Sequence, residues 1–127
     1  MALELTAEKY PKKIEVGYLS FYVLRTKIAY AYSEELGDRY LRLTKNPHTL
    51  TEEEIAEWNT NCNDDLDLLL WHSDMDGKLT VEECERLNTV LKKLEIKFED
   101  EHFLFLFDEF FKLLEHCCKE KVPMLFS

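Results

Sequence analysis

Residues 72–83 read His-Ser-Asp-Met-Asp-Gly-Lys-Leu-Thr-Val-Glu-Glu, and this stretch decides the predicted fold. Asp74 and Asp76 stand two residues apart, and Gly77 follows directly. Glu83 closes the segment. Helical patterns precede and follow it, so the sequence predicts a helix-loop-helix unit whose loop gathers carboxylates.

The carboxylates of this stretch suit a hard cation. Calcium binds about six to eight oxygen atoms in a flexible cage, with Asp and Glu carboxylates among its ligands. Asp74 and Asp76, the third and fifth residues of the loop, turn their side chains to the same inner side. Gly77 permits a sharp turn that a side chain would block. Glu83 stands on the first turn of the following helix, where both of its oxygens can chelate an ion.

The pattern resembles the calcium loop of the EF-hand superfamily, over about residues 64–94. The resemblance implies a divergent calmodulin-like or sarcoplasmic calcium-binding-like protein that binds Ca²⁺. The implied metal ligands are the side chains of Asp74, Asp76 and Glu83, the backbone carbonyl of Lys78, and Thr80 through a water, with His72 at the first loop position.

His72 departs from the family pattern, which has an aspartate at this position. A neutral imidazole is a poor calcium ligand and brings no negative charge, because calcium prefers oxygen ligands. Only Asp74, Asp76 and Glu83 then supply charge, so we expect weakened calcium affinity. The alternative is a loop of the same shape held by hydrogen bonds, with Glu83 serving only as a helix cap.

Composition favours long helices. The 127 residues contain three glycines and three prolines, which leaves few turn signals. Alternating strand patterns bounded by turn dipeptides are missing. The sequence therefore predicts an all-α fold of four to five helices in a single domain, 1–127. The expected elements are a lead over 1–11 and helices over about 12–44 with a break near Gly37, 51–71, 81–94 and 99–121.

An internal repeat suggests a second loop. Leu50 to Glu54 matches Leu79 to Glu83 at an offset of 29 residues. One interpretation is a degenerate EF-hand loop at 43–54, and the other is two helix starts that share a capping box. EF-hand loops usually pair, which leaves three arrangements open: pairing with 43–54, pairing with a second copy of the chain, or a lone loop braced by the helices.

The formal net charge is −10, and it is concentrated. Residues 51–85 hold 12 acidic and one basic side chain, whereas the flanking parts are nearly balanced. Such a field attracts cations or basic partners and repels nucleic acid. A solvated acidic helix face is the simpler interpretation of a charge run.

Catalytic motifs are weak. Glu99 and His102 have the spacing of di-iron helical bundles, but such sites need two of these motifs and further glutamates. His116, Cys117 and Cys118 are adjacent, so their side chains fan out around a helix and do not share an ion. We expect no enzymatic activity, with a metal-dependent helical-bundle enzyme as the weakest alternative.

The start of the chain and its cysteines favour the cytoplasm. Residues 1–6 contain neither the basic residues nor the apolar run with which a secretory signal peptide begins. The four cysteines, Cys62, Cys84, Cys117 and Cys118, are then expected to be reduced thiols. The chain contains no run of 18 apolar residues, so we expect no membrane span.

The last helix is apolar on all sides over Phe103 to Phe107. Such a helix is buried all round or meets another chain. An aromatic core is one interpretation, and a protein partner or self-association through the aromatic helices is the other. The predicted function is a calcium-binding EF-hand-type protein that acts through protein–protein contacts. The alternative is a calcium-independent helical adaptor or light-chain-like subunit.

Overall fold

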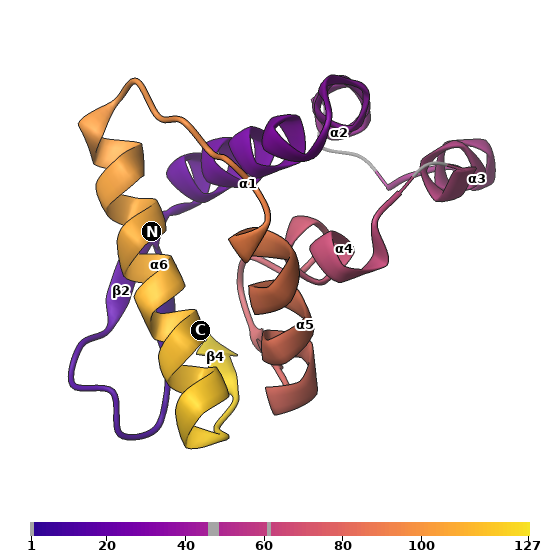
Figure 1. The fold of residues 1–127 in the computed structure, drawn as a ribbon. Helices are drawn as coiled ribbons and strands as arrows, with labels where there is room; N and C mark the ends of the chain where they lie inside the picture. The colour runs from indigo at the N-terminus through magenta and orange to yellow at the C-terminus, as the bar shows by residue number, and fades with distance from the viewer. Residues whose placement is uncertain (1, 46–48, 61) are drawn as a thin grey trace.

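The computed structural model describes residues 2–45, 49–60 and 62–127 (Figure 1). Within them it contains six helices and a four-stranded antiparallel sheet, so the predicted all-α class and the four to five helices are wrong. In chain order the elements are β1 (Ala2–Thr6), β2 (Ile14–Gly17), α1 (Tyr18–Tyr32), α2 (Glu34–Thr44), α3 (Glu52–Thr60), α4 (Asp64–Leu70), β3 (Gly77–Leu79), α5 (Val81–Lys92), α6 (Glu101–Glu120) and β4 (Met124–Phe126).

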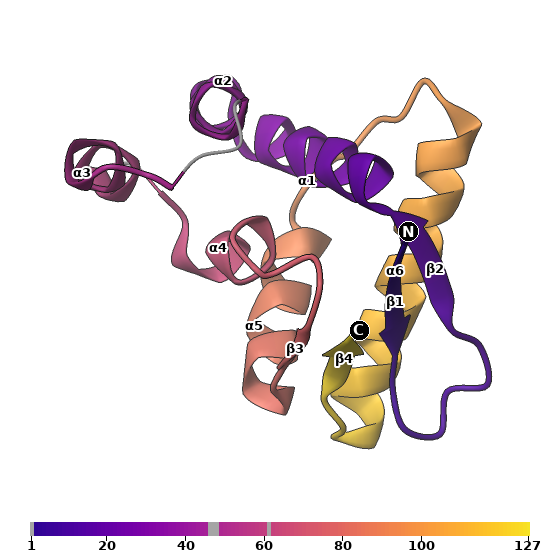
Figure 2. The same ribbon diagram turned by 180° about the vertical axis from the view of Figure 1, so that it is seen from behind.

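The sheet joins both ends of the chain to the loop. Its strand order is β2-β1-β4-β3, and α6 lies across one face (Figures 1 and 2). Leu3 pairs with Val16, and Leu5 pairs with Phe126. These four side chains are buried, whereas Glu15 on the opposite face is exposed. The structure is therefore a helical layer on a small sheet with one apolar face.

The strands were missed because each is only three to five residues long. Leu3 and Leu5 alternate with polar neighbours, and so do Ile14 and Val16, which is the period-two signal of a half-buried strand. The connection between them is too long for a two-residue hairpin turn, so the turn dipeptides that usually mark strands are missing. The predicted lead over 1–11 contains β1.

The helix predicted over 12–44 is divided into β2, α1 and α2. The break falls at Ser33, whose hydroxyl accepts the amide of Leu36 at 3.0 Å and caps α2. Gly37 lies inside α2 instead of at the break. A Cβ there would overlap the Tyr30 ring, so this glycine allows α1 and α2 to pack closely.

The helix predicted over 51–71 is also divided. α3 begins within the Thr51–Glu54 capping box, which the sequence identified correctly. Asn63 caps α4 by accepting the amides of Asp65 and Leu66 at 3.0 Å. Trp58 is the buried residue of α3, which lies at the edge of the molecule (Figure 1). The proposed degenerate loop at 43–54 includes residues 46–48, which lie outside the described residues.

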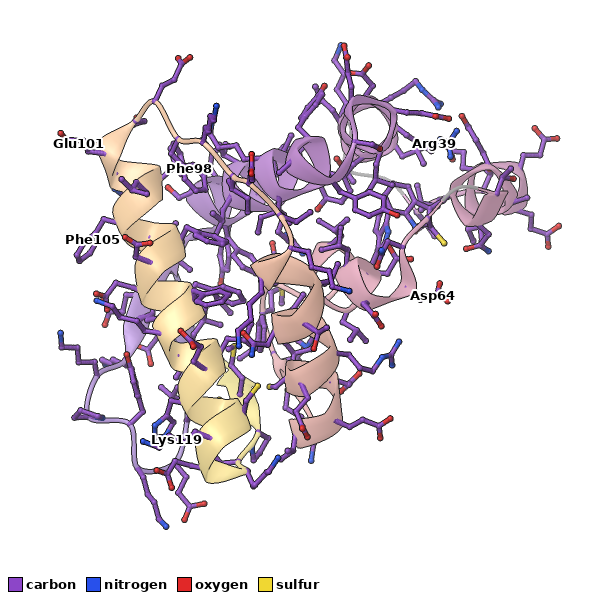
Figure 3. The ribbon with its side chains drawn as sticks, viewed as in Figure 1. Arg39, Asp64, Phe98, Glu101, Phe105 and Lys119 are labelled. Atoms are coloured by element: carbon purple, nitrogen blue, oxygen red, sulfur yellow. The ribbon has the colours of Figure 1, made fainter. Side chains whose placement is uncertain are left out.

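The last two helices are confirmed. α5 begins at the Thr80 cap and α6 ends before Pro123, with Lys121 in the left-handed conformation at φ 57°. Of the two interpretations of residues 103–107, burial on all sides is wrong. Leu106 is buried, but Phe105 is 66% exposed and points away from the body (Figure 3). No helix among the described residues has the length and hydropathy of a membrane span.

Candidate functional site: the loop at residues 72–83

A buried arginine holds the start of the loop. Arg25 of α1 is 7% exposed, and its guanidinium lies 4.4 Å from the centre of the Phe21 ring. Its Nη1 donates to the carbonyl oxygens of Leu70 at 3.3 Å and His72 at 2.8 Å, and also reaches Leu69. A cation is favourable at this end of α4, because the last carbonyls of a helix carry partial negative charge.

The His72 imidazole lies inside the loop. Its Nε2 is 3.1 Å from the carbonyl oxygen of Lys78, and its Nδ1 is 2.8 Å from that of Ser73. A neutral ring donates to one of these oxygens, and an imidazolium donates to both. The ring also stacks on Phe126, with the centroids 3.8 Å apart. The first loop residue therefore bridges the loop to its seventh residue and to β4.

Gly77 has the role expected of it. Its φ is +100°, a conformation that side chains rarely adopt. A Cβ there would lie 3.3 Å from Cε1 of His72. Gly77 thus permits the sharp turn and leaves room for the imidazole of His72.

Two of the loop carboxylates are bonded to the loop itself. Asp76 accepts the Ser73 hydroxyl at 3.1 Å. Glu83 accepts the amide of Thr80 at 2.9 Å, while the Thr80 hydroxyl accepts the amide of Glu83 at 3.2 Å. This is the predicted capping box.

These positions do not form a calcium cage in this conformation. The Lys78 carbonyl is already hydrogen-bonded to the imidazole of His72. In the part of the chain that the structure describes, the one group of three potential metal-ligating side chains within 4.8 Å is Cys62, Asp64 and Asp67, outside the loop. In this conformation the loop side chains are not gathered around one point, and their role as calcium ligands stays a prediction.

The loop pairs with the end of its own chain. Gly77 pairs with Phe126, and Leu79 with Met124. The strand of this loop, β3, therefore pairs with β4. In EF-hand proteins, by contrast, two loops usually pair with each other. Of the three arrangements left open by the sequence, the lone loop braced by helices agrees best with the structure. The difference is that a strand, β4, braces the loop as well.

Sequence reasoning missed an aromatic cluster beside the loop. The Tyr40 ring lies 6.0 Å from Trp58 and 5.4 Å from Trp71, centre to centre. Burial raises the pKa of Tyr40 to about 12, and its hydroxyl donates to the Leu70 carbonyl at 2.9 Å. The three aromatic residues come from separate segments, so no spacing in the sequence indicates that they form a cluster.

The other candidate residues do not assemble into a site. His102 is exposed near the start of α6. His116 Nε2 is 2.8 Å from the Glu8 carbonyl. All four cysteines are free thiols. A hydrogen bond from the Cys84 thiol lowers the pKa of Cys117 and raises that of Cys84.

Comparison with known proteins identifies no family. No family model matches the chain, and neither a curated protein nor a solved structure matches it. The EF-hand resemblance therefore rests on the residues of the loop and its flanking helices.

Proposed function

We propose that this chain is a calcium-independent helical adaptor that binds another protein, with an EF-hand-like loop retained as scaffold. The observation that carries the proposal is the position of the His72 ring between the Lys78 carbonyl and Phe126. In this arrangement a side chain from within the loop makes the contact that an ion would otherwise make.

Energetics support a loop that works without calcium. An ion would have to displace the imidazole from the Lys78 carbonyl and remove its stacking on Phe126. Each of these contacts is worth about 0.5–1.5 kcal/mol. Only three carboxylates would compensate, because His72 replaces the first one. β4 also fixes the loop through backbone pairing, which needs no ion.

Exposed apolar side chains support a protein partner. Phe105 is 66% exposed and Leu104 is 44% exposed, side by side on α6. This pair is part of the surface proposed to meet the partner, because contiguous exposed apolar patches mark protein contact sites. The partner is a different protein or a second copy of the chain.

The proposal includes three further expectations. The four free thiols support a reducing compartment, and a cytoplasmic location is part of the proposal. The net charge of −10 disfavours nucleic acid as the partner. The proposal also includes the expectation that the protein has no enzymatic activity.

Calorimetric titration with calcium tests the proposal against the competing function, a calcium-binding protein of weakened affinity. We expect no saturable heat up to millimolar calcium and the same melting temperature in calcium and in chelator. Saturable heat that Glu83→Gln abolishes would establish the competing function instead.

The adaptor surface is tested separately. Phe105→Glu is expected to leave the melting temperature within a few degrees, because the side chain is mostly exposed. Sedimentation velocity of both proteins at high concentration then compares self-association. A dimer that the substitution dissociates identifies a second copy as the partner, and two monomeric proteins direct the search to a different protein.

A further inference from the structure

A small cavity lies between α3 and the end of α4. Its volume is about 220 Å³. Pockets that bury a drug-sized ligand measure about 300–1,000 Å³, so this one is of a size for a single side chain. Its lining consists of Leu50, Ile55, Trp58, Asn59, Asp67 and Trp71.

Two indoles form its rigid part. The rings of Trp58 and Trp71 meet at 88° with their centroids 5.0 Å apart. Tyr40 lies behind both and is fully buried, which fixes their positions. Aromatic faces attract cations, and a preformed wall adds no ordering cost on binding.

A carboxylate without a cation completes the lining. Both oxygens of Asp67 accept Nε1 of Trp58 at 3.1 Å. No lysine or arginine of the described ranges forms an ion pair with Asp67. Partial burial raises the pKa of this carboxyl, while the Trp58 hydrogen bond opposes that shift. A carboxylate offers about four acceptor positions, so further donors can bind it.

The surroundings favour a positive ligand. The first turns of α3 and α4 carry acidic side chains, among them Glu52, Glu53 and Asp64. Asp64 projects from the start of α4 (Figure 3). The stretch 51–85 holds 12 acidic residues and one basic residue. This field draws a cation to the cavity from a distance.

We propose that this cavity binds a basic side chain of the partner protein, seated against the indoles and paired with Asp67. The inference rests on the proposed function, because it names the chemistry of that partner. Arginine fits best, since its planar guanidinium stacks on aromatic faces and pairs with a carboxylate through two parallel hydrogen bonds.

Tryptophan fluorescence gives a direct test, because both tryptophans of the chain line this cavity. The probe is a seven-residue peptide of alternating glycine and arginine, and its matched control carries neutral citrulline in place of arginine. With chelator present, we expect a saturable fluorescence change with the arginine peptide and at least tenfold weaker binding of the citrulline peptide.

Two variants separate the cavity from the general acidic field. Asp67→Asn is expected to weaken arginine-peptide binding about tenfold, in line with the loss of a charge-assisted contact. Asp65→Asn removes the same charge from the same helix but breaks a surface pair with Arg86, so binding should change less than about twofold.

Ile55→Arg tests the same site without touching Asp67. Ile55 is 46% exposed, so we expect the substitution to leave the fold intact and to place a tethered guanidinium at the cavity. We expect it to abolish binding of the peptide.

The proposal is overturned by no fluorescence change, by equal binding of the two peptides, by equal effects of Asp67→Asn and Asp65→Asn, or by unchanged binding to Ile55→Arg. Calcium binding by the loop would refute the proposed calcium-independent function and leave these titrations unaffected, so the two failures are distinguishable.

Discussion

The Nε2 atom of His72 lies 3.1 Å from the carbonyl oxygen of Lys78, across the interior of the 72–83 loop. Arg25 binds the backbone of His72 from one side, and Phe126 stacks on its ring from another. The loop is therefore fixed at its entry, at its middle and against the last strand. Its conformation depends on these contacts, and each of them can be removed by one substitution.

His72→Asp restores the carboxylate that the EF-hand pattern has at the first position. We expect the variant to be less stable than the unmodified protein in chelator, by about 1–2 kcal/mol, because it loses a hydrogen bond and a stacked ring. We also expect calcium to raise its melting temperature. Thermal unfolding in calcium and in chelator measures both effects. An equal calcium response in the unmodified protein would contradict the scaffold role of His72.

Arg25→Met removes the cation that holds the end of α4. The His72 carbonyl loses its side-chain donor, while the Leu70 carbonyl keeps only the Tyr40 hydroxyl. The expected loss is about 2–4 kcal/mol of unfolding free energy. Urea unfolding measures it. Arg86→Met is the matched control, since its pair with Asp65 is exposed and should contribute less than about 1 kcal/mol. Equal losses in the two variants would show that the buried contacts contribute little.

Phe126→Ala tests the attachment of the loop to the sheet. The side chain is buried, packs against Phe21 with centroids 6.3 Å apart, and stacks on His72. Truncating a buried phenylalanine costs about 3–5 kcal/mol. Leu125→Ala on the exposed face should cost less than about 1 kcal/mol. Chemical denaturation compares the two, and a small loss from Phe126→Ala would mean that the last strand is dispensable.

Asp67 gives stability a defined pH dependence. Because burial raises its folded pKa above the unfolded value, the folded state holds this proton more tightly. Asp67 therefore contributes stability below the unfolded pKa, and that contribution is lost as pH rises through the folded pKa. Relative to Asp67→Asn, the unmodified protein should gain stability as pH falls from 7 toward 4, by about 1 kcal/mol or less since the group is only half-buried. Urea unfolding at both pH values measures this, and a difference of opposite sign would contradict it.

Local patterns predicted what local interactions control. The capping boxes at Thr51 and Thr80 are formed as expected, and so are the last two helices and the turn at Gly77. Each of these depends on residues within a few positions of one another. The break at Ser33 was open to the same reasoning, since serine is a strong N-cap residue.

Long-range features escaped prediction. The sheet brings Leu5 beside Phe126, and strands of three to five residues carry too little periodic signal to be separated from loops. The exposure of Phe105 depends on which face of α6 meets the sheet. The pairing of Asp67 with Trp58 depends on how α3 folds back toward α4.

The helix starts at Thr51 and Thr80, the turn at Gly77 and the acidic character of residues 51–85 could be predicted from the sequence, because they follow from neighbouring side chains and from charge alone. Three features depend on the tertiary structure: β4 is the strand paired with the loop, the His72 ring lies within the loop, and Trp58 and Trp71 line one cavity. The physical reason is that burial of apolar surface is non-directional. Burial of apolar surface selects among many pairings of short strands and helix faces. No local sequence pattern indicates which pairing encloses the core.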